Sequence, residues 1–86
     1  MKSFSFVPSG VCSRLMTFDL DDQLRVHNLV VQGGCNGNLK GIAALSENQP
    51  AVDLVKRLAG IHCGSKASSC PDQFAKALEK ALREQS

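Results

Sequence analysis

The sequence lacks long apolar runs and lacks an excess of charge of either sign. No stretch approaches the ~20 residues of a membrane-spanning helix, and residues 1–8 contain no apolar run of signal-peptide length. Ten Lys and Arg residues are mixed with eight Asp and Glu residues, which gives a net charge of +2 without a basic stripe. We therefore expect a soluble, cytoplasmic protein that binds neither a membrane nor nucleic acid.

The sequence also lacks the motifs of nucleotide sites and of paired catalytic carboxylates. Gly33, Gly34 and Gly37 form a glycine-rich segment, but no GK(S/T) element or Rossmann-type spacing accompanies them. Asp21 and Asp22 are adjacent, which is typical of a hairpin turn. These patterns predict turns in the backbone and no catalytic centre.

At 86 residues, the chain has room for one core. Because ~150 residues per domain is the usual prior, we expect a single domain over residues 1–86. A chain this short buries only about 60–65% of its unfolded surface, so a metal, a disulfide or a partner would add a large share of its stability. A catalytic pocket of ~300–1,000 Å³ is hard to enclose at this size. We do not expect the isolated chain to be an enzyme.

Apolar and polar residues alternate over residues 12–20, which predicts a half-buried strand. After the turn at Asp21 and Asp22, the Val- and Leu-rich run over residues 24–32 predicts a second strand that pairs with the first as an antiparallel hairpin. Phe4 and Phe6, two residues apart, indicate a short edge strand.

Three helices are expected after the hairpin. Helical spacing over residues 39–45 follows a candidate cap at Asn36, and Pro50 opens a second helix that stops at Gly60. In the last helix, Ser69 or Cys70 caps an apolar stripe, and Asp72 is a first-turn acid with no further predicted role. The stripe comprises Phe74, Ala77, Leu78, Ala81 and Leu82. Strands followed by helices predict an α+β fold, in which the helices pack on one face of a small antiparallel sheet.

Each of the four cysteines lies where one element ends or another begins. Cys12 opens the first strand of the hairpin and Cys35 lies in the glycine-rich turn after the second strand. A hairpin brings these two positions to the same end of the sheet. Cys63 follows a helix stop and Cys70 starts the last helix, where the helix dipole favours a thiolate. The loop between them is rich in Gly and Ser, so it can return to the same site.

In a reducing compartment, this arrangement favours metal binding over structural disulfides. We predict that Cys12, Cys35, Cys63 and Cys70 are metal ligands, with zinc as the first choice and an iron–sulfur cluster as the alternative. Two other interpretations stay open: Cys63 and Cys70 form a redox pair, or the cysteines are small core residues, since no CxxC pair occurs. His62 is a weaker ligand candidate than the cysteines.

His27, in the middle of the second predicted strand, is interpreted as an ordinary sheet residue.

Three motifs carry a resemblance to the TSCPD domain family. They are GGCNGN at residues 33–38, GIHCG at 60–64 and SSCPDQ at 68–73. The resemblance covers the chain from about Val11 to Leu82, including the VCSR segment at 11–14. The last motif has Ser68 where the family usually has Thr, and this change keeps the hydroxyl.

The family's larger members carry this domain at the C-terminus of adenosylcobalamin-dependent ribonucleotide reductases. The resemblance therefore implies an accessory domain linked to ribonucleotide reduction and DNA replication, with a reductase or another protein as its partner. The reductase activity itself is not implied, because 86 residues cannot hold its barrel, substrate site and radical apparatus.

The chain also bears a fainter resemblance to iron–sulfur cluster scaffold proteins, in the order and surroundings of Cys12, Cys35 and Cys70. Arg14 stands where those scaffolds have an acidic residue. The resemblance therefore implies a related fold more than it implies cluster assembly.

Overall fold

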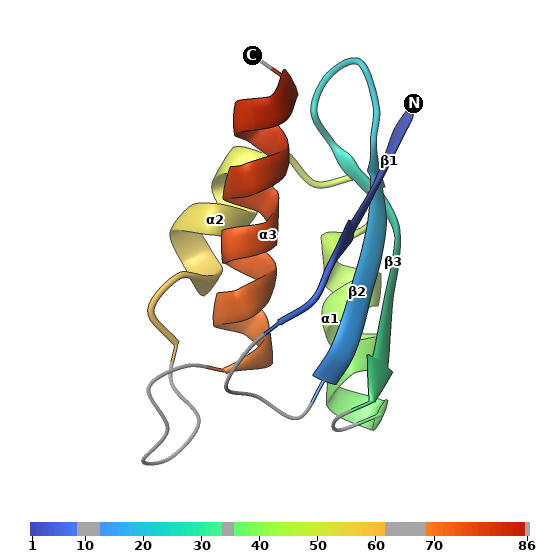
Figure 1. Ribbon diagram of the computed structural model, residues 1–86, viewed down its shortest axis with the longest axis vertical. Helices are drawn as coiled ribbons and strands as arrows, with labels where there is room; N and C mark the ends of the chain where they lie inside the picture. Colours follow the sequence, from blue (N-terminus) through green and yellow to red (C-terminus); the bar gives the residue numbers. More distant parts are fainter. Residues whose placement is uncertain (9–12, 34–35, 62–68, 86) are drawn as a thin grey trace.

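A computed structural model describes residues 1–8, 13–33, 36–61 and 69–85 of the chain. Three strands are followed by three helices (Figure 1). The strands are β1 (Lys2–Phe6), β2 (Ser13–Leu20) and β3 (Val26–Gly33), and the helices are α1 (Asn36–Ser46), α2 (Ala51–Leu58) and α3 (Cys70–Gln85). This order confirms the predicted α+β class and the short strand around Phe4 and Phe6. Within these residues, no helix is both long and apolar enough to cross a membrane.

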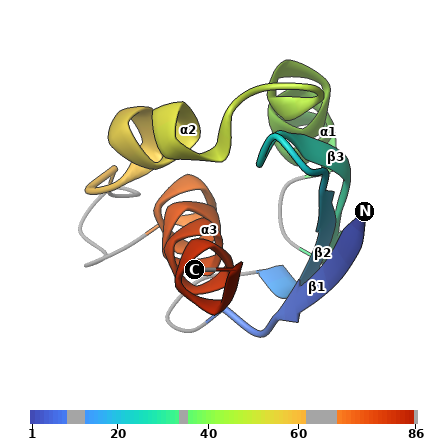
Figure 2. The ribbon, with the colours of Figure 1, turned by 90° about the horizontal axis from the view of Figure 1, so that it is seen from above.

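The strands form one antiparallel sheet in the order β1-β2-β3, with β2 in the centre. All three helices lie on one side of this sheet (Figure 2). α1 packs against β3, α3 contacts β1, and α2 packs on α3. The hairpin of β2 and β3 is the one that the sequence predicts, because its two apolar runs flank the turn at Asp21 and Asp22.

The core forms where the inner face of β2 meets α3. Successive side chains of a strand point to opposite faces, so every second residue of β2 reaches the helices. The ring of Phe18 packs edge-on against Phe74 of α3 with their centroids 5.8 Å apart, and it stacks on Phe4 of β1 at 5.7 Å. Full burial of side chains of this size contributes about 1.5–3 kcal/mol each. The buried cluster also contains Met16, Leu20, Val26, Leu29, Ala51, Leu54, Ala77, Leu78 and Ala81.

A β-bulge interrupts β3. Thr17 pairs with Val30 and Asp19 pairs with His27, so the one residue between them on β2 is matched by two residues on β3. Asn28 lies inside this interval and has a φ of 56°, in the left-handed region that Asn tolerates better than most residues.

The bulge decides which residues of β3 reach the core. Val26 and Leu29 are three residues apart, and in a regular strand they would face opposite sides. Both are buried, because the extra residue shifts the alternation by one, whereas Val30 next to Leu29 is 53% exposed.

The connection between α1 and α2 runs beside the start of β3. The Val26 N–H donates to the Gln49 carbonyl, and the Val26 carbonyl accepts from the Asn48 N–H, at 2.9 and 2.7 Å. The Ala51 N–H donates to the Leu24 carbonyl at 3.0 Å. These backbone bonds attach the helical half of the chain to the hairpin.

α1 begins at Asn36 itself, which was predicted as its cap, whereas the predicted boundaries of α2 and the predicted start of α3 agree with the structure. Pro50 is the N-cap of α2, and Gly60, with a φ of 85°, follows the end of that helix. At the start of α3, the hydroxyl of Ser69 accepts from the Asp72 N–H at 3.2 Å, which identifies Ser69 as the cap.

Candidate functional site

Of the four predicted metal ligands, only Cys70 lies within the described residues. It is the first residue of α3 and is partly buried. Cys12, Cys35 and Cys63 lie outside the described residues, as does His62. Within residues 1–8, 13–33, 36–61 and 69–85, no group of three or more His, Cys, Asp and Glu side chains is arranged to hold a metal ion. The four-cysteine centre therefore stays a prediction.

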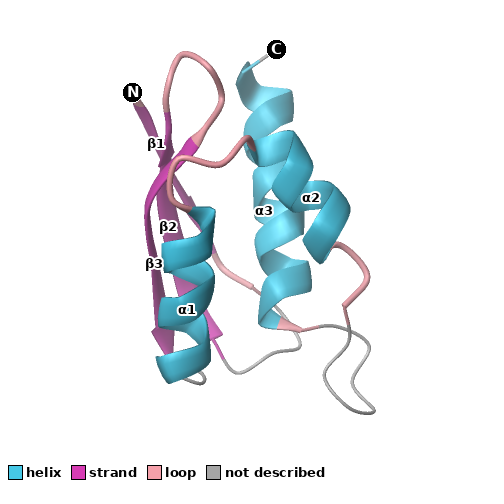
Figure 3. Cartoon of the chain, turned by 180° about the vertical axis from the view of Figure 1, so that it is seen from behind, coloured by secondary structure: helices cyan, strands magenta, loops and turns pink. Residues whose placement is uncertain are grey.

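The elements that flank the cysteines meet at one end of the molecule. The start of β2, the end of β3, the start of α1 and the start of α3 all lie at the lower end in Figure 1, and the view from behind in Figure 3 agrees. Ser13 and Gly33 pair across the hairpin at this end. Cys12 is one residue before Ser13 in the sequence, and Cys35 is two residues after Gly33.

The two residues that border the undescribed segment 62–68 are joined by a hydrogen bond. The Ser69 hydroxyl donates to the Ile61 carbonyl. The same hydroxyl accepts from the Asp72 N–H, so this one side chain both caps α3 and attaches it to the chain that leaves α2.

Asp72 forms the second attachment. Its Oδ1 accepts from the Gly60 N–H at 2.7 Å, and its Oδ2 lies 3.6 Å from Nζ of Lys76. The side chain of Asp72 is only 6% exposed. The prediction that Asp72 has no role beyond the first turn is therefore wrong, because its carboxylate also fixes the end of α2. Together, Ser69 and Asp72 hold the beginning of α3 against residues 60 and 61, with Cys70 between them in the sequence.

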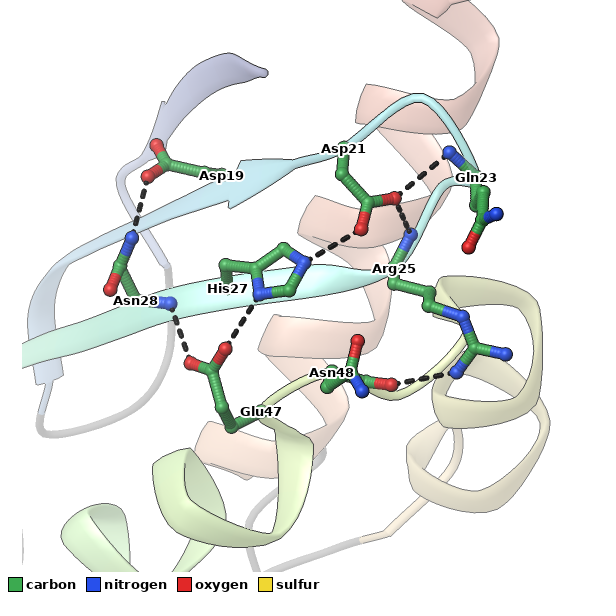
Figure 4. Close-up of polar contacts among 8 residues, drawn as sticks. All are labelled: Asp19, Asp21, Gln23, Arg25, His27, Asn28, Glu47 and Asn48. Atoms are coloured by element: carbon green, nitrogen blue, oxygen red, sulfur yellow. Dashed lines mark hydrogen bonds and ion pairs between the residues drawn. The ribbon is translucent and has the colours of Figure 1, made fainter.

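A polar cluster lies at the opposite end of the sheet, near the hairpin turn (Figure 4). Nε2 of His27 is 2.7 Å from Oδ2 of Asp21, and Nδ1 is 2.6 Å from Oε2 of Glu47. Asp21 begins the turn and Glu47 follows α1, so the imidazole of β3 connects the turn with the end of a helix. An ionised carboxylate only accepts hydrogen bonds, so both ring nitrogens must donate, and this requires the imidazolium form of His27.

Backbone N–H groups hold both carboxylates in place. Oδ1 of Asp21 accepts from the N–H groups of Gln23 and Arg25 at 2.9 and 3.0 Å, and Oε1 of Glu47 accepts from the Asn28 N–H at 2.9 Å. The turn role predicted for Asp21 is thus confirmed.

Two further contacts border the cluster. Asp19 accepts from the Ser3 hydroxyl at 2.6 Å and from the Asn28 side-chain amide at 3.0 Å. Arg25 donates from its guanidinium to the Asn48 carbonyl at 2.8 Å. They add links from β1 and from the α1–α2 connection to the same end of the sheet.

The contacts shift the pKa values in opposite directions for the acids and the base. Hydrogen bonds to Asp21 and then to Glu47 raise the pKa of His27 above its ordinary value of 6.5. The N–H of Arg25 and then His27 lower the pKa of Asp21, and the N–H of Asn28 and then His27 lower the pKa of Glu47. Around neutral pH the three groups therefore favour one imidazolium between two carboxylates.

Sequence reasoning missed the role of His27. The interpretation as an ordinary sheet residue was correct for its place in β3 but not for its side chain. Its partner Glu47 is 20 residues away, across a helix, and no local pattern indicates such a pair. The one signal in the sequence was Asp21, which lies six residues before His27 in the turn that leads into β3.

Comparison with known proteins identifies the family. The family model for the TSCPD domain matches residues 2–82, which is nearly the whole chain. The protein therefore belongs to the TSCPD domain family, and this membership links it to domains of ribonucleotide reductases. Neither the curated proteins nor the solved structures gave a match.

The attachment at the start of α3 generates a stability prediction. Asp72→Ala should lower the free energy of unfolding by about 1.5–3 kcal/mol, because it removes a charged acceptor from the Gly60 N–H. Asp53→Ala is the matched control, since Asp53 is also a first-turn acid but is exposed. It should cost only about 0.3–1 kcal/mol through the helix dipole. Urea denaturation measures both, and equal losses in the two variants would contradict the assigned role.

The polar cluster predicts a pH dependence of stability. His27 has a raised pKa, so its contribution is complete below about pH 6.5 and is lost as the pH rises through the folded-state pKa. Asp21 and Glu47 have lowered pKa values, so their contribution is present above their unfolded-state values and is lost in acid. Relative to that of His27→Gln, the urea midpoint of the wild type should therefore decrease as the pH rises above about 6.5.

The comparison uses the difference between the two proteins at each pH, because contributions from other groups, including His62 and the cysteine thiols, then cancel. The neighbouring charges of Asp19 and Arg25 are present in both. Parallel profiles over this range would show that His27 is not held as an imidazolium. Proton NMR of the imidazole should independently give a pKa above 6.5.

Proposed function

We propose that this protein is a zinc-binding accessory domain of ribonucleotide reduction, with Cys12, Cys35, Cys63 and Cys70 as the four ligands. The observation that carries the proposal is the meeting of the flanking elements at one end of the fold (Figure 1). Four thiolates from separate segments suit the tetrahedral coordination of structural zinc.

Chain geometry limits how far the cysteines can lie from described residues. In the sequence, Cys12 is one residue before Ser13 and Cys63 is two residues after Ile61, and consecutive Cα atoms of a chain are only ~3.8 Å apart. Ser13 pairs with Gly33, and Ile61 is bonded to Ser69, the residue before Cys70. These links support two pairs of neighbouring cysteines at the same end of the molecule.

Cys70 has the surroundings expected of a thiolate ligand. It is the first residue of a helix of 16 residues and therefore lies at the positive end of the helix dipole. The contacts of Ser69 and Asp72 on either side fix the backbone that carries it. A ligand held in advance loses less conformational freedom on binding.

Family membership supports the link to ribonucleotide reduction. The single small buried cluster of the described residues supports an accessory role more than an enclosed substrate site with a protected radical. The second candidate function is a thiol-redox or iron–sulfur protein, which the position of Cys70 at a helix start also favours.

Metal analysis of protein purified without air tests the proposal. We expect about one zinc per chain, and each of Cys12→Ser, Cys35→Ser, Cys63→Ser and Cys70→Ser should lose most of it. Ser69→Ala is the control, because it disturbs the same helix start without removing a thiol. Removal of zinc by a chelator should lower the melting temperature, since a metal a thousandfold above its Kd adds about 4 kcal/mol to the folded state.

The other outcomes separate the alternatives. A brown chromophore with iron and sulfide would favour the cluster. Stable, metal-empty protein that retains its melting temperature after chelation would overturn the structural-metal proposal and favour an interaction module with buried thiols.

The accessory role predicts that the isolated protein reduces no ribonucleotide with any cobalamin or thiol donor. It should instead be recovered with a reductase from a cytoplasmic extract through the exposed face of α3. That face carries Lys76, Lys80 and Arg83. Reversing all three charges should abolish recovery, whereas Lys40→Glu with Lys56→Glu, on exposed positions of α1 and α2, should not. Turnover by the isolated chain would overturn the accessory role.

A further inference from the structure

An apolar groove is lined by residues of α1, of α2 and of the connection between them. Figure 3 shows these two helices on the side of the molecule that faces the reader. α1 packs on β3 whereas α2 packs on α3, so the two helices leave space between them. The groove has a volume of about 360 Å³, and its apolar walls are formed by Ile42 and Leu45 of α1 and by Leu54 and Leu58 of α2. This volume is sufficient for an inserted apolar side chain.

Leu45 is both a wall of this groove and a protruding side chain. It is 79% exposed, the largest fraction recorded for a large apolar side chain in the described residues. Covering so exposed a leucine with another surface removes apolar area from water, and this favours association. The same small surface therefore presents an apolar projection and an apolar hollow.

The α2 rim of the groove carries one charge of each sign. Asp53 and Arg57 are one helical turn apart, both line the groove and both are exposed. Among the described residues, neither forms an ion pair. If two α2 helices run antiparallel and a two-fold axis passes beside residue 55, residue 53 of each helix lies opposite residue 57 of the other.

We propose that the groove between α1 and α2 is the interface of a homodimer, in which each protomer inserts Leu45 into the partner's groove and Asp53 pairs with the partner's Arg57. A two-fold axis places the same patch on both sides, so the patch must complement itself in shape and charge. This one does, because it supplies a projection, a hollow, an acid and a base. A partner of another kind would need only one member of each pair.

The size of the patch sets the strength of the dimer. An interface with one groove and one inserted side chain from each protomer falls at the low end of specific interfaces, so we expect a Kd of roughly 10 µM to 1 mM. The paired charges lie at the exposed rim, and their contribution should therefore weaken with added salt. The inference is independent of the proposed zinc site, which lies at the end of the fold where α3 begins.

Sedimentation velocity in the presence of a reductant, from ~10 µM to ~1 mM, tests the proposal. The wild type should shift from monomer to dimer across this range. Leu45→Lys should weaken the dimer at least tenfold, because the charged side chain cannot enter the groove. Val30→Lys is the matched control, since Val30 is also an exposed apolar residue but lies on β3, and it should leave the equilibrium unchanged.

Charge exchange tests the two-fold arrangement. Asp53→Arg and Arg57→Asp should each weaken the dimer several-fold, because each places like charges opposite one another, and the double variant should recover most of the wild-type Kd. Circular dichroism verifies that every variant is folded. A wild type that is monomeric at 1 mM, a dimer that survives Leu45→Lys, or a double variant no better than the single ones would overturn the proposal.

Discussion

Packing of α3 against the central strand is the contact on which the positions of the other elements depend. Phe18 of β2 touches Phe74 of α3 on one side and Phe4 of β1 on the other, so one side chain joins the helix to two strands. α2 is held mainly by α3 and not by the sheet. Loss of this contact would therefore also remove the surface on which α2 packs.

The two ends of the fold carry different polar groups. At one end, the carboxylates of Asp21 and Glu47 enclose His27, and all three groups are occupied by contacts within the fold. At the other end, the elements that flank the cysteines begin or terminate, and Ser69 and Asp72 position the start of α3. The first cluster thus uses its polar groups for contacts within the fold, whereas the second end is where the predicted ligands flank the described elements.

Much of the fold could be predicted from the sequence because its strongest patterns are local. The alternation that ends at Leu20 and the stripe from Phe74 to Leu82 each describe one face of one element. Within the described residues, both faces pack into the core as predicted. The turn at Asp21 and the cap at Ser69 depend on side chains that bond to their own backbone within a few residues.

The contacts that were missed are those between distant segments. The bond of His27 to Glu47 spans 20 residues and that of Asp72 to Gly60 spans 12. The bulge at Asn28 was hidden for another reason: the run over residues 24–32 is so rich in Val and Leu that its alternation does not show which residues face the core. For the site, the sequence placed the four cysteines at element ends, and the structure describes the surroundings of Cys70 alone.

The contacts of the α1–α2 connection also bear on aggregation. β3 is an outer strand, and an outer strand exposes N–H and carbonyl groups that can pair with a strand of another chain. Here the outward N–H of Val26 is taken by the Gln49 carbonyl, and the N–H of Asn28 is taken by the Glu47 carboxylate. Because the bulge at Asn28 also breaks the regular spacing, a second strand cannot extend the sheet along the first half of β3. The residues that attach the helices to the hairpin thus also block edge-to-edge pairing along this part of β3.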